Sequence, residues 1–193
     1  MNLCHRGSGG DGLMKGEKLM AIHKPNADST PAEKALYTAL VARRMTKWLV
    51  SHPSKNGVKW QLVEFNGRAG QESGGIVDLI AIRKNHKPLE KDWNRGDLFE
   101  IVLLQVKGGK ARYPTGPDVA RLLAVKDYHR AERVLLAEWK PAEKLCLYEL
   151  TDPNHVEPSE IREKKVAASD VFGKVPKLTI KQIHAAALAK MKK

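Results

Sequence analysis

The chain has 193 residues and a formal net charge of +12, from 34 Lys and Arg against 22 Asp and Glu. Hydrophobic residues make up 42% of the sequence, which suffices for a folded core and excludes a wholly disordered chain. No apolar run is long enough to span a membrane, and the start of the sequence lacks the apolar segment of a secretory signal. Only two cysteines occur, without CxxC spacing, which favours a cytoplasmic location and argues against a structural zinc site.

The excess of positive charge predicts a polyanionic partner. For a cytoplasmic domain this basic, nucleic acid is the first candidate. The less specific alternative is a basic RNA-associated or ribosome-associated factor. Charge alone does not distinguish these two classes of protein.

The composition changes along the chain and divides it into three parts. Residues 1–28 are rich in glycine and are expected to form a flexible N-terminal tail. Residues 29–150 hold the periodic apolar segments of one α/β domain. Residues 151–193 are polar and contain three prolines, so we expect a C-terminal extension that ends in a short basic helix near 179–192.

The domain is expected to begin with a helix. Thr30, Pro31 and Glu33 have the spacing of a capping box with proline at the first helical position. Apolar residues then recur at helical spacing to about residue 50, and His52 and Pro53 end the pattern.

Further elements follow in an order typical of an α/β fold. The pattern predicts strands at 58–65, 75–83 and 98–107, a helix at 117–130, and strands at 133–139 and 145–150. The second and third strands are apolar on both faces, which places them in the interior of a sheet. The fold class is therefore α/β, with a central mixed β-sheet flanked by helices.

Three polar residues interrupt the two interior strands. Asp78 shares a face with isoleucines, and Gln105 and Lys107 end the next strand on a face that is otherwise apolar. If the two strands form a hairpin, the residue numbers of each cross-strand pair add up to about 181. Asp78 then faces position 103, give or take two. Burying such groups is costly unless they pair or bind a ligand. Carboxylate and amide oxygens suit Mg²⁺ or Mn²⁺, and a lysine beside them can stabilise charge on a phosphate.

These residues carry a resemblance to a known superfamily. The sequence Gly75-Ile76-Val77-Asp78 followed by Gln105-Val106-Lys107 resembles the signature of the PD-(D/E)XK nucleases. The likeness covers roughly residues 30–150 and is greatest to the restriction-endonuclease-like and Holliday-junction-resolvase-like members. It implies a restriction-endonuclease-like core and a metal-dependent endonuclease that hydrolyses phosphodiesters in DNA with water activated by Mg²⁺.

The resemblance also implies roles for individual residues. Asp78 and Gln105 would bind the metal, Val106 would lend its backbone carbonyl, and Lys107 would assist the attacking water. Gln105 stands where an acid is usual, which removes one negative ligand. The alternative is therefore a catalytically inactive nuclease-fold protein that binds nucleic acid.

Members of the superfamily often supply one further acid. Glu33 is the first candidate, although it also completes the capping box. Glu64 at the end of the first strand and Glu72 in the glycine-rich loop are the other two.

Basic residues near these motifs are candidates for binding phosphate groups. They lie in the loop before the third strand, directly after Lys107, and in the glycine-rich loop: Lys84, Lys87, Arg95, Lys110, Arg112 and Arg68. Many nucleases of this type act as homodimers, so a homodimer is possible, but no segment of this sequence marks an interface.

Overall fold

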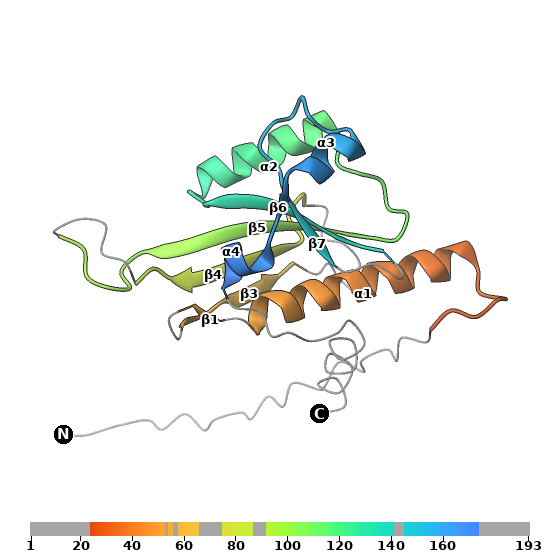
Figure 1. Ribbon diagram of the computed structural model, residues 1–193, viewed down its shortest axis with the longest axis horizontal. Coiled ribbons are helices and arrows are strands. Elements are labelled where there is room, and N and C mark those ends of the chain that lie inside the picture. The colour runs from red at the N-terminus through yellow and green to blue at the C-terminus, as the bar shows by residue number, and fades with distance from the viewer. Residues whose placement is uncertain are drawn as a thin grey trace, which may run out of the picture.

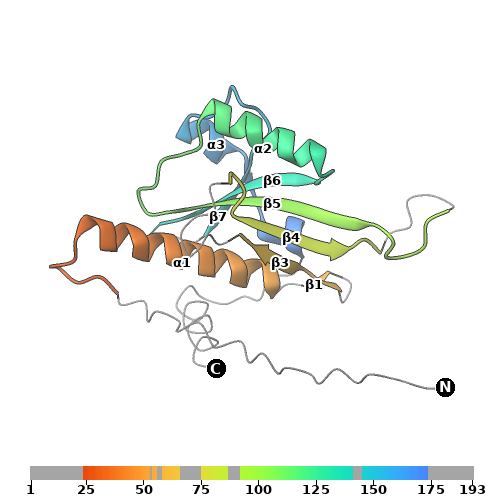
Figure 2. The same ribbon diagram turned by 180° about the vertical axis from the view of Figure 1, so that it is seen from behind.

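The computed structural model describes residues 24–52, 54–55, 58–65, 75–86, 92–140 and 145–173. The described residues form three layers, with a mixed six-stranded sheet in the middle (Figures 1 and 2). Most of the predicted N-terminal tail and the whole predicted last helix lie outside the described residues. No helix in the described part of the chain is long and apolar enough to cross a lipid bilayer.

Helices cover both faces of the sheet. Helix α1 (Pro31–Ser51) lies along one face, and α2 (Gly116–Tyr128) and α3 (Pro158–Glu163) lie on the other. The short α4 (Ala168–Phe172) packs on the α1 side, because Phe172 belongs to the same apolar core as Val50 of α1.

The six strands are antiparallel to their neighbours, except for one central pair. Their order across the sheet is β3 (Gln61–Glu64), β4 (Leu79–Lys84), β5 (Phe99–Gly108), β6 (Arg133–Trp139), β7 (Cys146–Glu149) and β8 (Lys165–Val166). Strands β5 and β6 are parallel, and α2 connects them. A separate two-stranded sheet is formed by β1 (Ser54–Lys55) and β2 (Val58–Lys59). The predicted α/β class with a mixed sheet is confirmed.

Local capping chemistry sets where the two long helices begin. The Thr30 hydroxyl accepts the backbone N–H of Glu33, and the Glu33 carboxylate accepts the N–H of Thr30, so the predicted capping box is present. Thr115 and Asp118 form the same arrangement at the start of α2. These bonds satisfy N–H groups that the first helical turn leaves without intrahelical partners.

Side chains of β5 alternate between the two cores. Val102 and Leu104 belong to the core beneath α1, whereas Leu103 packs with Leu122 of α2 and Leu136 of β6. All five side chains are almost completely buried, as expected for strands inside a sheet with helices on both faces.

Part of the predicted C-terminal extension belongs to this sheet. Residues 151–173 supply α3, β8 and α4, and β8 pairs with β7. Phe172 is 0% exposed, its ring meets Trp60 edge to face, and its carbonyl accepts the Trp60 indole N–H at 3.2 Å. The sequence pattern does not reveal this, because the few core residues of the segment are separated by polar ones.

Replacing Phe172 should therefore destabilise the whole domain. Phe172→Ala removes a fully buried ring and is expected to lower the free energy of unfolding by about 3–5 kcal/mol. Tyr128→Ala is the matched control, because Tyr128 is 84% exposed and its loss should change stability by less than about 0.5 kcal/mol. Urea unfolding followed by circular dichroism measures both. Equal midpoints for the two variants would show that α4 is not part of the core.

Candidate functional site

Asp78 lies at the end of the β4–β5 ladder, next to its last residue pair. That pair is Leu79 with Leu104, so Asp78 precedes it on one strand and Gln105 follows it on the other. The backbone N–H of Asp78 donates to the Leu104 carbonyl at 3.0 Å, which is one residue out of the register that pairs Leu79 with Leu104. Asp78 is therefore beside Leu104, which lies within the interval predicted from the hairpin arithmetic.

The Asp78 side chain ends the ladder between these strands. Its Oδ2 accepts the backbone N–H of Val106 at 2.6 Å, where the backbone of β4 would otherwise supply a carbonyl. In a strand, the N–H and C=O of one residue point to the same side, so the Val106 carbonyl also faces the space beyond β4. On the other carboxylate oxygen, Oδ1, the Arg43 guanidinium of α1 lies at 3.3 Å.

Gln105 and Lys107 project toward the α2 side of the sheet, as Leu103 does. Gln105 is 8% exposed, and its Oε1 has no hydrogen-bond partner among the described residues. Leaving a buried amide oxygen without a partner costs about 1–3 kcal/mol, so this atom is suited to a ligand. Lys107 is half-buried, and within the described part of the chain it takes part in no ion pair.

Lys107 lies close enough to the start of α2 to act on its capping residue. Hydrogen bonds from the Thr115 backbone and hydroxyl lower the pKa of Asp118, and the positive charges of Lys107 and Arg121 lower it further. Lys107 is therefore near the N-terminus of α2. The partial positive charge of the helix backbone there adds to the charge of the lysine.

Glu64, rather than Glu33, is the acid that lies near Asp78. Glu64 ends β3 and pairs in the ladder with Leu79. Arg43 lies between the two acids, with its Nε at 4.0 Å from Glu64 and its Nη2 at 3.3 Å from Asp78. Lys47 also pairs with Glu64.

Glu33 is held elsewhere by its capping role. Its carboxylate accepts hydrogen bonds from the backbone and hydroxyl of Thr30, which lower the pKa of Glu33. It precedes Arg43 by ten residues, which is about 15 Å along a helix. The structure thus does not bring Glu33 to the other predicted residues. Glu72 lies outside the described residues.

A close backbone contact fixes α1 over this end of the sheet. A Cβ atom at Gly108 would lie 2.4 Å from the carbonyl oxygen of Thr38, so only glycine permits this approach. With Thr38 against the end of β5, the next turns of α1 carry Arg43 and Lys47 over β4 and β3.

Three oxygen donors on β4 and β5 are of the kind that a hard divalent cation prefers. They are the Asp78 carboxylate, the Gln105 amide and the Val106 carbonyl, and Mg²⁺ takes such ligands while keeping several waters. Among the described residues, no group of three His, Cys, Asp or Glu could hold a metal ion. Asp78 already pairs with Arg43, so an ion at this carboxylate would have to compete with the guanidinium.

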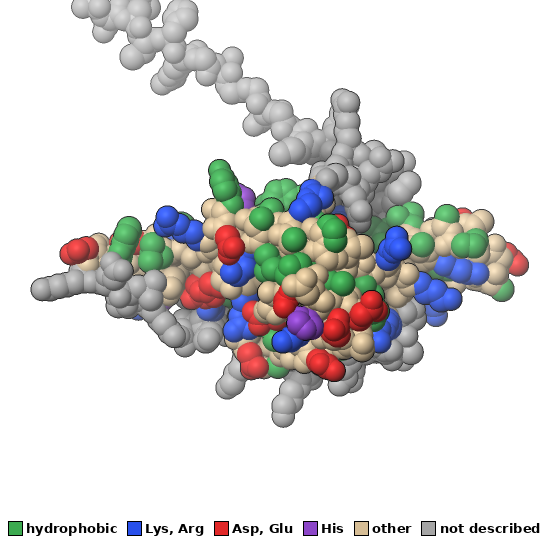
Figure 3. All heavy atoms as spheres, turned by 90° about the horizontal axis from the view of Figure 1, so that it is seen from above, with side chains coloured by type: hydrophobic (Ala, Val, Ile, Leu, Met, Phe, Trp, Pro, Cys, Tyr) green, Lys and Arg blue, Asp and Glu red, His purple; other side chains and the backbone are tan. Residues whose placement is uncertain are grey.

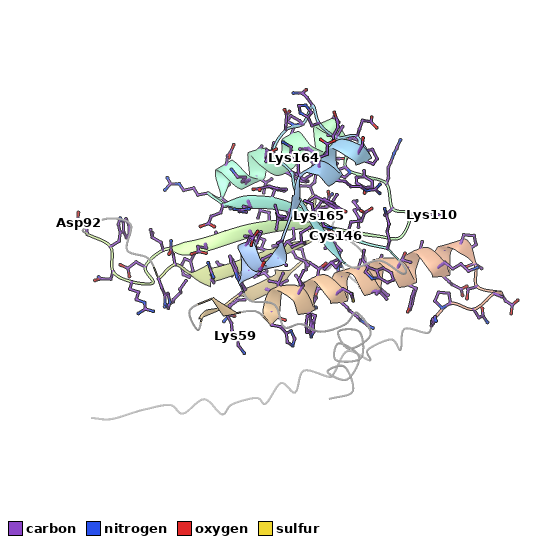
Figure 4. All side chains as sticks on the ribbon, viewed as in Figure 1. Lys59, Asp92, Lys110, Cys146, Lys164 and Lys165 are labelled. Atoms are coloured by element: carbon purple, nitrogen blue, oxygen red, sulfur yellow. The ribbon has the colours of Figure 1, made fainter. Side chains whose placement is uncertain are left out.

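The predicted phosphate-binding residues divide between two ends of the β4–β5 hairpin. Lys84 and Arg95 lie at the far end, which is about 20 Å from Asp78 along a six-residue strand. Lys110 and Arg112 follow β5 directly and lie exposed at the same end as Lys107. Figure 4 shows Asp92 and Lys110 at opposite ends of the molecule. Lys87 and Arg68 lie outside the described residues.

Charge on the face formed by α2 and α3 is mixed. Acidic side chains gather near the middle of this face, and basic ones lie on either side (Figure 3). The positive excess is therefore not a single patch over these helices, which makes the end bearing Lys107, Lys110 and Arg112 the better phosphate surface.

Sequence reasoning missed a second buried carboxylate. Glu138 of β6 pairs in the parallel ladder with Lys107, and its Oε1 accepts the Tyr113 hydroxyl at 2.6 Å. Lys140 and Arg162 lie at 3.4 and 3.6 Å from the same oxygen. The sequence could have indicated Glu138, because it is a lone acid in the apolar strand Arg133–Trp139. The same pattern identified Asp78.

Comparisons of this chain with family models, with curated proteins and with solved structures found no match. The candidate site therefore depends on the geometry described above.

Alkaline pH should reveal the environment of Tyr113. Burial first, and then the hydrogen bond to Glu138 and its charge, raise the pKa of Tyr113 from 10 to about 12. The unfolded chain loses the Tyr113 hydroxyl proton at a lower pH than the folded chain does. The stability contributed by the protonated hydroxyl is therefore present below pH 10 and is lost as the pH rises toward 12.

Tyrosinate absorbance measures the effect directly. Subtracting the Tyr113→Phe titration from that of the wild type isolates the Tyr113 transition near pH 12. Glu138→Gln should move this transition toward lower pH, whereas the control Glu100→Gln, whose carboxylate pairs with Arg83, should not. A Tyr113 transition that Glu138→Gln leaves in place would contradict the assigned contact.

Proposed function

We propose that the protein is a metal-dependent nuclease that hydrolyses phosphodiester bonds in DNA. The observation that carries the proposal is that Asp78, at the end of the β4–β5 ladder, accepts the backbone N–H of Val106, the residue between Gln105 and Lys107 on the neighbouring strand. This is the arrangement that the sequence resemblance implies for such an enzyme.

The order of elements supports the same proposal. Helix α1, the antiparallel strands β3, β4 and β5, helix α2, and then β6 parallel to β5 follow the order that the resemblance implies for a restriction-endonuclease-like core. Strands β7 and β8 extend the sheet beyond that core.

Each residue of the site has a chemical role in this proposal. Asp78, the Gln105 amide oxygen and the Val106 carbonyl would hold Mg²⁺ or Mn²⁺, which when bound supplies Lewis-acid activation of water and phosphate. Lys107 would donate hydrogen bonds to the attacking water or to the phosphate as negative charge develops. Lys110 and Arg112 would contact neighbouring phosphates along the backbone.

A second function is favoured by the pairing of Asp78 with Arg43. The guanidinium already neutralises the one charged ligand, and Gln105 adds no charge, so the fold can bind nucleic acid without a metal. In this alternative the protein is a catalytically inactive binding module, and Lys107 is one phosphate contact among several.

Two sets of substitutions separate chemistry from affinity. Lys107→Ala should abolish Mg²⁺-dependent cleavage of linear, nicked, flapped or four-way DNA and lower affinity little, because it removes one cation of many. Lys110→Glu with Arg112→Glu should weaken binding to all sequences and reduce the salt slope by roughly two. Electrophoretic mobility shifts over a salt series and product gels measure both.

The matched controls lie at β8, the edge strand of the sheet on the far side of β6 and β7 from β5. Lys165→Ala controls for loss of a lysine, and Lys164→Glu with Lys165→Glu controls for the charge reversal, because both lysines are exposed near β8. If the wild type binds DNA but cuts none of these substrates, the binding module replaces the nuclease. If it does not bind DNA at low salt, both functions are wrong.

Metal affinity should rise when charge at the site becomes more negative. Gln105→Glu adds a carboxylate beside Asp78, and Arg43→Gln removes the competing cation, so each should tighten Mn²⁺ binding by about tenfold or more, corresponding to about 1.4 kcal/mol. Isothermal titration calorimetry measures the affinity for Mn²⁺. Asp78→Asn should abolish Mn²⁺ binding.

Arg133→Gln is the control for Arg43→Gln, because Arg133 pairs with Glu149 away from the site. Unchanged or weaker Mn²⁺ binding in both the Gln105 and Arg43 variants would exclude these residues from a metal site.

A further inference from the structure

Glu138 is a buried carboxylate that the proposed chemistry leaves without a role. It is 5% exposed, near the end of β6, on the same side of the sheet as Leu136 and α2. The parallel register makes it the cross-strand neighbour of Lys107. A buried carboxylate is tolerated only with good partners, and removing one of them is strongly unfavourable.

One oxygen of Glu138 connects three separate parts of the chain. Oε1 accepts the hydroxyl of Tyr113, which belongs to the loop after β5. Lys140 follows β6, and Arg162 belongs to α3, and both pair with this oxygen. Arg162 also donates to the Tyr113 hydroxyl at 3.0 Å and lies over the Tyr113 ring.

The loop that contains Tyr113 carries the basic residues nearest the candidate site. Backbone hydrogen bonds hold its beginning, from Gly109 N–H to the Trp139 carbonyl at 2.8 Å and from Ala111 N–H to the Gly108 carbonyl at 3.2 Å. Beyond Ala111, the Tyr113 hydroxyl bonds to Glu138 of the sheet, and the next residue, Pro114, is buried before the capping box of α2 begins at Thr115. Lys110 and Arg112 themselves are exposed.

We propose that Glu138 and Tyr113 are positioning residues that hold the loop 109–115 against the sheet and so fix Lys110 and Arg112 beside Lys107 for contact with a phosphate backbone. The ligand in this statement rests on the proposed function, whereas the attachment of the loop does not. Charges held in place before binding lose less conformational entropy on contact than charges on a free loop.

Limited proteolysis tests the attachment of the loop. Trypsin cleaves after Lys110 and Arg112 only when the loop opens, so Tyr113→Phe and Glu138→Gln should speed cleavage there by about tenfold, the effect of losing one hydrogen bond to a charged group. Tyr113→Phe removes a single oxygen atom and keeps the ring, and Tyr128→Phe is its exposed control. Unchanged cleavage in both variants, or cleavage that rises equally at all sites, overturns the attachment.

DNA binding tests the positioning role separately. In a linear duplex titration, Tyr113→Phe should weaken binding and lower the salt slope, but should add little in a chain that already carries Lys110→Glu and Arg112→Glu. Faster tryptic cleavage with unchanged DNA affinity and salt slope overturns the positioning role. A wild type that does not bind duplex DNA overturns the proposed function and with it the ligand named here, while the tryptic result still decides the attachment.

Discussion

The carboxylate of Asp78 connects the sheet, helix α1 and the candidate site. One oxygen replaces a backbone carbonyl at the end of the β4–β5 ladder, and the other meets a guanidinium from α1. The same group therefore ends a strand, orients a helix and provides the charged oxygen of the site. Any ligand that takes Asp78 must compete with Arg43, and a displaced Arg43 still has Glu64 within reach.

The two sides of the sheet hold polar groups of different character at this end. On the α1 side, Arg43 and Lys47 balance Asp78 and Glu64, so charge is nearly neutral. On the α2 side, the buried Glu138 is surrounded by Tyr113, Lys140 and Arg162, next to Lys107 in the ladder. Among these residues, the positive charges of Lys107, Lys140 and Arg162 exceed the single negative charge of Glu138.

Local patterns predicted the elements that such patterns control. The capping box at Thr30, the buried strands and the hairpin register follow from residue type and spacing. The sequence alone favours Glu33, because a first-turn acid fits both a cap and a ligand, and only the position of α1 over the sheet decides between them. That position depends on the close contact between Gly108 and Thr38, which no spacing reveals.

Gln105 and Arg43 together leave the candidate site stable without a metal. A buried amide without a partner costs about 1–3 kcal/mol, whereas a buried carboxylate without a counter-ion costs considerably more. A glutamate at position 105 would lie beside Asp78, whose charge Arg43 already shares with Glu64, so its own charge would rely on Lys107 or on a cation from solution. On the proposed function, the neutral residue would lower metal affinity and would also remove the need for a metal to stabilise the fold. Lys107 and the 109–115 loop would then be in place for nucleic acid before any ion is bound.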